Sequence, residues 1–183
     1  MKLPKRNAVV TDLEVVDVGK KGKGVAKNDS LVVFIEGGVP GDRLDARVTK
    51  RKKSYVEGTP VQFHAYSDDR VIPFCEHFDA CGGCKAQHIS YEAQTRLKAH
   101  FVKDNLTKIG NVPEPNLQPI VPAPAERYYR NRLGFAFTNN RWITEAEKAT
   151  GETVSDRQGV GLHVPGRFDK VIDIEHCYLQ PEP

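Results

Sequence analysis

The cysteines of this chain place the strictest limit on its fold. Cys75, Cys81 and Cys84 form a C-x5-C-x2-C cluster, and Cys177 follows after 92 intervening residues. Thiolates bind soft metals such as zinc or the irons of an iron–sulfur cluster. The two glycines between Cys81 and Cys84 allow a tight turn that would aim both sulfurs at one centre. Four thiolates complete either a tetrahedral zinc site or a cubane cluster, so the spacing predicts a metal site without choosing the metal.

A pair of disulfides is the alternative use of four cysteines, and it requires an oxidising compartment. The amino terminus leads into polar sequence and has no apolar run of signal-peptide length. No stretch approaches the roughly 20 apolar residues of a membrane span. We therefore expect a cytoplasmic, monomeric protein of one or two globular domains that does not bind membranes.

The first third of the chain is a basic module. Residues 1–53 carry 13 Lys and Arg against 7 Asp and Glu, whereas the whole chain has a net charge of only +3. The densest run is Lys50, Arg51, Lys52 and Lys53, with Tyr55 close behind. Basic side chains beside an aromatic ring suit phosphate neutralisation and base stacking, so we predict that this run binds RNA. The alternative is an ordinary solvated strand end.

The same module has the spacing of short β-prone segments that a small barrel requires. Short β-prone runs occupy residues 15–18, 31–35, 44–49 and 61–63, and glycine or proline separates them. This pattern predicts a five-stranded, OB-like β-barrel over residues 1–66. A linker at residues 66–73 follows the barrel. A small α+β domain is predicted over residues 67–183. The predicted fold class of the whole chain is therefore mainly β.

One helix is predicted directly after the cysteine cluster. Ser90 is a candidate N-cap, Glu92 suits the first turn, and Gly110 ends the helix. Leu97, Phe101, Val102, Leu106 and Ile109 recur at helical spacing, and we interpret this apolar stripe as core. Residues 112–124 are proline-rich and read as an extended connection.

The last third reads as an antiparallel sheet that the helix could cover. Residues 128–138 alternate as a half-buried strand, with Arg130 and Arg132 on the polar face as further RNA-binding candidates or as ordinary solvated charges. Residues 160–164 and 171–174 form a predicted hairpin through Pro165–Gly166, which would return Cys177 to the other cysteines. Residues 144–158 are polar and aperiodic, and we expect an exposed insertion there.

Several of these segments resemble known proteins. Residues 22–26, 34–35 and 39–42 look like a TRAM domain, which also occurs in other RNA-modifying enzymes. Residues 75–84 with Gln87 and His88 are similar to the iron–sulfur loop of the RNA uridine-5-methyltransferase family, which modifies 23S rRNA and tRNA. Residues 129–132 and 171–177 resemble the central domain of that family in content and order. The resemblance covers nearly the whole chain.

The resemblance implies a [4Fe-4S] cluster on Cys75, Cys81, Cys84 and Cys177 in place of zinc, and rRNA or tRNA as partner. It implies a structural cluster, because methyl transfer from S-adenosylmethionine needs no electron and radical enzymes typically show C-x3-C-x2-C spacing. Full-length members use S-adenosylmethionine to methylate C5 of a uridine after a cysteine thiolate adds to C6.

The chain departs from the family where the catalytic domain would begin. It ends at Pro183, contains no glycine-rich cofactor loop after a strand, and has no fifth cysteine to act as nucleophile. We therefore expect no catalytic residue and no S-adenosylmethionine site in this chain, and we interpret it as the amino-terminal, RNA-engaging part of such an enzyme.

Other interpretations remain open at this point. A histidine, His77 or His88, could replace one thiolate ligand, and Tyr129 or Trp142 could stack on bases. A free-standing RNA-binding adaptor stapled by zinc is one rival function. A redox protein whose cluster transfers electrons or senses oxidants is the other.

Overall fold

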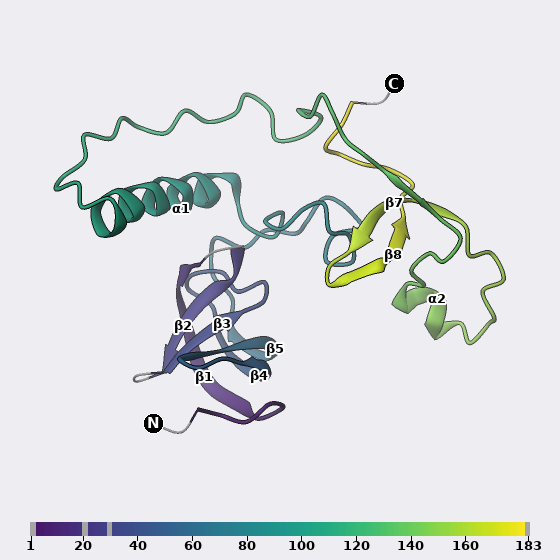
Figure 1. Ribbon diagram of the computed structural model, residues 1–183, viewed down its shortest axis with the longest axis horizontal. Helices are drawn as coiled ribbons and strands as arrows, with labels where there is room; N and C mark the ends of the chain where they lie inside the picture. The colour runs from purple at the N-terminus through teal and green to yellow at the C-terminus, as the bar shows by residue number, and fades with distance from the viewer. Residues whose placement is uncertain (1–2, 20–21, 29–30, 182–183) are drawn as a thin grey trace. The chain divides into compact units, whose positions relative to one another are not determined.

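The computed structural model describes residues 3–19, 22–28 and 31–181. The chain folds into two compact units (Figure 1). The barrel unit consists of Met1–Ile72 and His88–Pro122, and the cysteine unit consists of Pro73–Gln87 and Ala123–Pro183. The sequence-based domain ranges, 1–66 and 67–183, stay predictions. None of the described helices is long and apolar enough to cross a membrane.

Five strands close the barrel in the order β1-β2-β3-β5-β4, which confirms the predicted five-stranded barrel. They are β1 (Val9–Val18), β2 (Gly24–Asn28), β3 (Leu31–Ile35), β4 (Arg43–Arg51) and β5 (Tyr55–Ala65). Neighbours are antiparallel except for β3 and β5, which run parallel. The β-prone runs of the sequence lie inside β1, β3, β4 and β5. They miss β2, whose glycine and lysine weaken its β signal.

The barrel core follows the period of two that a strand requires. In β3, for example, Leu31, Val33 and Ile35 are buried and the residues between them are partly exposed. The full set of buried core residues is Leu13, Val15, Ala26, Leu31, Val33, Ile35, Leu44, Ala46, Val48 and Val56. Gly24 allows one close approach, because a Cβ there would lie 2.8 Å from the Gly38 carbonyl oxygen.

A buried ion pair ties the barrel to the segment that follows it. Asp42 is fully buried and accepts hydrogen bonds from Arg70 Nε and Nη2, each at 2.7 Å, and from the backbone N–H groups of Val39 and Ser67. Burial alone would raise the pKa of Asp42, but these donors outweigh burial and lower it. The Arg70 guanidinium also lies 5.0 Å from the centre of the Phe63 ring.

Helix α1 (Tyr91–Asp104) continues into η2 (Asn105–Ile109), a short π-helical turn. Both predicted ends are confirmed: the Ser90 side chain accepts a hydrogen bond from Ala93 N–H at 3.3 Å, and Gly110 caps the carboxyl end. Arg96 binds both carboxylate oxygens of Asp69, which anchors the helix to the linker. Asp69 therefore has a structural role in positioning the helix.

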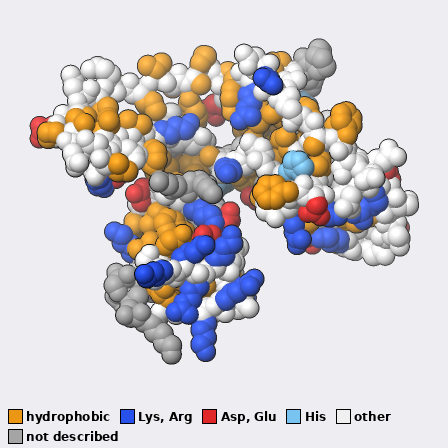
Figure 2. All heavy atoms as spheres, viewed as in Figure 1, with side chains coloured by type: hydrophobic (Ala, Val, Ile, Leu, Met, Phe, Trp, Pro, Cys, Tyr) orange, Lys and Arg blue, Asp and Glu red, His pale blue; other side chains and the backbone are white. Residues whose placement is uncertain are grey.

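The interpretation of the helical stripe as core is wrong beyond its first turns. Ala93 packs with Val39 and Ile89, and Leu97 joins them. Phe101, Val102 and Ile109, however, are 48%, 49% and 70% exposed. Figure 2 shows apolar side chains along α1 on its visible face. The buried residues of the helix pack within the barrel unit, and its expected packing on the carboxy-terminal sheet stays a prediction.

The cysteine unit holds one small antiparallel sheet of β6 (Ala136–Thr138), β7 (Gly159–Val164) and β8 (Arg167–Asp173). The predicted hairpin through Pro165–Gly166 is confirmed, and Gly166 takes the positive φ of 75° that such a turn favours. Residues 144–158 are mostly exposed, as expected. They nevertheless contain a short helix, α2 (Glu145–Ala149), which Thr144 and Glu147 start with a capping box.

The strand predicted over residues 128–138 is wrong except for its last three residues. Tyr128 has a φ of +57°, which interrupts an extended chain. The backbone N–H groups of Tyr128 and Arg130 instead donate to the carbonyls of Tyr178 and Leu179, each at 2.8 Å. The first residues of the alternating segment therefore form a short, irregular backbone pairing with residues 178–179 and do not form a strand of the sheet.

Candidate metal centre and nucleic-acid interface

A turn-rich loop carries the first three cysteines. Cys81 N–H donates to the His77 carbonyl at 2.8 Å, and Gly82 N–H donates to the His163 carbonyl at 3.1 Å, which attaches the loop to β7. A Cβ on Gly82 would lie 2.4 Å from that same His163 oxygen, and one on Gly83 would lie 2.6 Å from Leu162 Cδ1. Close approach to the β7 backbone therefore requires glycine at position 82, whereas a Cβ at position 83 would meet the end of the Leu162 side chain. The spacing of the cysteines alone does not reveal this approach.

All four cysteines line one cavity of the cysteine unit. The three loop cysteines come from residues 75–84, and Cys177 comes from the segment after β8, as the predicted hairpin requires. Leu162, Ile174 and Leu179 add apolar walls. All four residues are free thiols in the structure.

Two of the thiols in this cavity, Cys75 and Cys81, lie in surroundings that disfavour the thiolate form. Burial raises the pKa of Cys75 and of Cys81, and the nearby sulfurs of Cys84 and Cys177 raise both further. The Gly83 N–H group opposes this at Cys81, where it donates to Sγ at 3.4 Å. A bound metal would reverse the balance, because it stabilises the thiolate form directly.

Two histidines, His77 and His176, also line the cavity, but each has a hydrogen bond. His77 Nε2 accepts from the Glu175 backbone N–H at 3.3 Å, and His176 Nε2 shares a hydrogen bond of 3.0 Å with the Tyr128 hydroxyl. His88 belongs to the barrel unit and does not line the cavity. The suggestion of His88 as a replacement ligand stays a prediction.

Within residues 3–19, 22–28 and 31–181, no group of three or more His, Cys, Asp or Glu side chains is arranged to hold a metal ion as it stands. The cysteines thus share a cavity without forming a finished coordination site. Their role as metal ligands stays a prediction.

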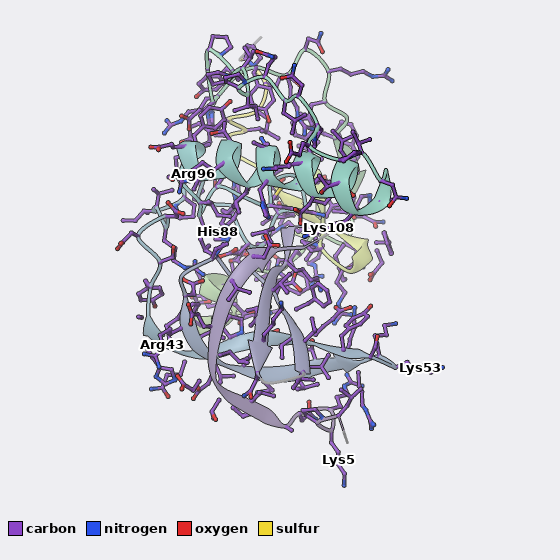
Figure 3. All side chains as sticks on the ribbon, turned by 90° about the vertical axis from the view of Figure 1, so that its left-hand side faces the viewer. Lys5, Arg43, Lys53, His88, Arg96 and Lys108 are labelled. Carbon is purple, nitrogen blue, oxygen red and sulfur yellow. The ribbon has the colours of Figure 1, made fainter. Side chains whose placement is uncertain are left out.

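The basic run lies at the end of the β4–β5 hairpin. Lys50 and Arg51 end β4, and Lys52 and Lys53 form the turn. Figure 3 shows Lys53 at the tip of this hairpin, pointing away from the barrel. All four side chains are exposed. Tyr55, in contrast, packs edge-on against Phe34 with ring centres 5.0 Å apart, so its ring is already engaged.

One acidic residue, Glu57, lies close to this basic run. Glu57 binds Lys23 at 2.6 Å and lies 4.0 Å from Lys50. The hydrogen bond from Lys23 is the main reason that the pKa of Glu57 is lowered, and Lys50 and Lys52 contribute smaller attractions. Among the described residues, Arg51, Lys52 and Lys53 form no ion pair with a carboxylate. Their charges are therefore available to bind a polyanion.

The other two predicted RNA-binding residues, Arg130 and Arg132, belong to the cysteine unit and are exposed. The structure therefore distributes the predicted RNA contacts over both compact units.

Sequence reasoning missed an aromatic cluster beside the thiol cavity. Phe74 precedes Cys75, Tyr178 follows Cys177, and their rings pack edge to face with centres 5.2 Å apart. The Arg127 guanidinium lies 4.1 Å from the Phe74 ring centre and 5.5 Å from that of Tyr178. An aromatic residue next to the first and the last cysteine is the sequence signal that could have revealed this cluster.

Comparisons with known proteins bear on both units. The TRAM domain family model matches residues 7–61. A protein of Bacteroides thetaiotaomicron named as an RNA methyltransferase is 42% identical over 88% of this chain and 36% of its own length. The 23S rRNA (uracil(1939)-C(5))-methyltransferase RlmD of Neisseria lactamica is 32% identical over 94% of this chain and 36% of its own. The chain thus spans about a third of the length of the curated relatives it matches.

A solved structure shares the fold. The tRNA (uracil-54, C5)-methyltransferase of Pyrococcus abyssi, in complex with S-adenosyl-L-homocysteine, matches 93% of this chain and 33% of its own with a TM-score of 0.53. At 22% identity this likeness concerns the fold alone. Because a TRAM domain occupies residues 7–61 and proteins named as RNA methyltransferases match most of both units, the chain belongs to the RNA methyltransferase family.

Proposed function

We propose that this chain is the RNA-engaging, cluster-bearing part of an S-adenosylmethionine-dependent 23S rRNA (uracil-5-)-methyltransferase. The observation that carries the proposal is the match to RNA methyltransferases across both compact units, one of them named for 23S rRNA. The barrel unit, with its exposed basic hairpin tip, and the exposed arginines of the cysteine unit would hold the RNA. A catalytic domain outside this chain would methylate the uridine at C5.

The proposed cofactor of the cysteine unit is a [4Fe-4S] cluster on Cys75, Cys81, Cys84 and Cys177. The cavity that all four cysteines share supports this donor set, as do its apolar walls. The cluster would act structurally, because it would join the 75–84 loop to the segment after β8. A reducing cytoplasm would keep the four thiols available for metal.

RNA binding by the chain is tested through its salt dependence. If Lys50, Arg51, Lys52 and Arg130 each neutralise one phosphate, log K against log salt should have a slope of about −3, at roughly −0.7 per contact for single strands. Replacing all four residues 50–53 by alanine should make the slope shallower and weaken binding in a fluorescence-anisotropy titration. A matched control replaces Lys98 and Lys103 of α1 by alanine and should leave the slope unchanged. An unchanged slope in the residue 50–53 variant would remove the hairpin tip from the RNA path.

The chain alone should neither bind S-adenosylmethionine nor transfer a methyl group. Attack on C6 of a uridine requires an unligated thiolate, and all four cysteines are assigned to the metal. The described strands of the cysteine unit form only an antiparallel sheet, whereas a dinucleotide-type cofactor fold alternates parallel strands with helices. Calorimetry with S-adenosylmethionine and transfer of a labelled methyl group to total RNA provide the measurements. Saturable cofactor binding or any turnover by this chain would contradict the assignment.

A further inference from the structure

The segment 127–132 of the cysteine unit contains three arginines and two tyrosines in six residues, and we name it the arginine–tyrosine segment. Two hydrogen bonds hold its backbone: the N–H groups of Tyr128 and Arg130 donate to the carbonyls of Tyr178 and Leu179. Those carbonyls directly follow Cys177. The segment therefore has a defined backbone while the side chains of Arg127, Tyr129, Arg130 and Arg132 remain exposed.

Arg127 is oriented before any ligand arrives. Its guanidinium lies over the Phe74 ring at 4.1 Å, and Tyr178 supports that ring from the side. A stacked guanidinium keeps its planar fork of N–H donors free at the edge, which suits bidentate binding of a phosphate. Among the ion pairs of the described residues, none involves Arg127, Arg130 or Arg132. Three positive charges within six residues, without a carboxylate partner among these ion pairs, favour a polyanion.

The two tyrosines have different surroundings. Tyr128 adopts a positive φ, which is rare for a bulky residue and often marks a functional site. Its hydroxyl is bonded to His176, and its ring packs 6.0 Å from that of Tyr178, so this side chain belongs to the aromatic cluster. Tyr129 is 57% exposed and has no ring contact in the described structure. Both side chains are exposed, Tyr128 at 41%, but only the Tyr128 ring is engaged by other aromatic rings.

We propose that Tyr129 is a stacking platform for one unpaired RNA base, and that Arg127, Arg130 and Arg132 bind the phosphates on either side of it. The inference rests on the proposed RNA-binding function and adds a specific nucleotide site to it. An exposed aromatic ring accepts any base face, and flanking arginines hold the backbone, as in other single-strand binding surfaces. The cation–π contact already restrains the Arg127 side chain, so the entropy cost of ordering it when it binds a phosphate is smaller.

The test uses the full chain with its metal and a labelled single-stranded RNA. Tyr129→Ala should lower RNA affinity by about ten-fold, and Tyr129→Phe should retain affinity because the ring remains. An abasic residue placed at successive positions of the RNA should weaken the wild type by a similar factor at one position. It should cause no further loss in Tyr129→Ala, because the same contact is already absent. Arg127→Ala should make the salt slope shallower by about 0.7, whereas Arg127→Lys should keep the slope and still weaken binding.

Phe168→Ala is the matched control, because Phe168 is an exposed aromatic residue of the same unit, and it should bind RNA as the wild type does. Thermal melting of Tyr129→Ala and Tyr129→Phe should match the wild type, since the Tyr129 side chain is exposed. Wild-type affinity in Tyr129→Ala, together with weakened binding in the residue 50–53 variant, would overturn the nucleotide site and leave the RNA-binding function standing. An absence of RNA binding by the wild type would overturn both.

Discussion

The barrel unit and the cysteine unit are held together by different forces. Among the described residues, thirteen buried hydrophobic side chains lie in the barrel unit and four in the cysteine unit. Those four are Val164, Val171, Ile172 and Leu179. A closed barrel pairs every strand edge and encloses a continuous apolar interior, so apolar burial can stabilise it alone. The cysteine unit has a three-stranded sheet and long irregular connections, and it resembles small domains that depend on a metal or a disulfide.

This contrast explains why the cysteines are where they are. Besides the apolar side chains that line the thiol cavity, a metal bound by the 75–84 loop and by Cys177 would join these two segments and add to a small hydrophobic core. The barrel unit contains no cysteine and needs none. The comparison therefore predicts that each unit can be damaged without the other.

The largest effect is expected for Cys177→Ser. Structural metals in small domains contribute roughly 10 kcal/mol or more of apparent folding free energy, so loss of one ligand should unfold the cysteine unit. Amide NMR signals of β7 and β8 should collapse while those of the barrel stay dispersed, and iron and sulfide analysis should show no cluster. Ser155→Ala, an exposed change in the same unit, is the control. A full complement of iron in Cys177→Ser would show that Cys177 is not a ligand. Zinc in the wild type would favour the zinc-stapled adaptor.

A smaller effect in the opposite unit is expected for Leu44→Ala. Leu44 is fully buried in the barrel core, and such truncations destabilise by about 2 to 5 kcal/mol because they leave a cavity. The urea midpoint of the barrel signals should fall while metal content stays unchanged. Val61→Ala on β5 removes a side chain that is 45% exposed, and its midpoint should move little. Loss of metal in Leu44→Ala would show that the two units are coupled.

The smallest effect is a pH dependence at α2 in the cysteine unit. The Arg141 guanidinium, at 2.6 Å, and the Thr144 backbone N–H lower the pKa of Glu147 from 4.5 to about 2. A lowered carboxyl pKa stabilises the fold fully above the ordinary value of 4.5, and this stability is lost as the pH falls from 4.5 towards 2. The pair is near the surface, so the contribution should be about 1 kcal/mol or less.

An NMR titration of the Glu147 side-chain carboxyl carbon measures this pKa. Arg141→Met should return the midpoint towards 4.5. A wild-type midpoint already near 4.5 would show that the ion pair does not form in solution.

Features encoded by neighbouring residues were predictable. Ser90 and Gly110 mark the two ends of the helix because capping depends on groups within one turn. The Pro165–Gly166 turn and its flanking strands are also local, and the hairpin carries Cys177 to the cavity as expected. The barrel followed from repeated short β-prone runs, although β2 was not among them.

Features that depend on distant partners were not predictable. Helical periodicity places Phe101 and Ile109 on one face, but it contains no information about whether another surface covers that face. The alternation at residues 128–138 resembles a strand, yet hydrogen bonds from Tyr128 and Arg130 to residues about 50 positions away decide its path.

The sequence by itself determined the closed barrel, the helix ends, the hairpin and the grouping of four thiols, because spacing, turn residues and strand periodicity act over short distances. Only the tertiary structure decided that the glycine pair approaches β7, that Arg127 stacks on Phe74, and that the Tyr128 ring joins an aromatic cluster while the Tyr129 ring does not. These features arise from contacts between segments that lie dozens of residues apart, where packing and backbone hydrogen bonds override local preference.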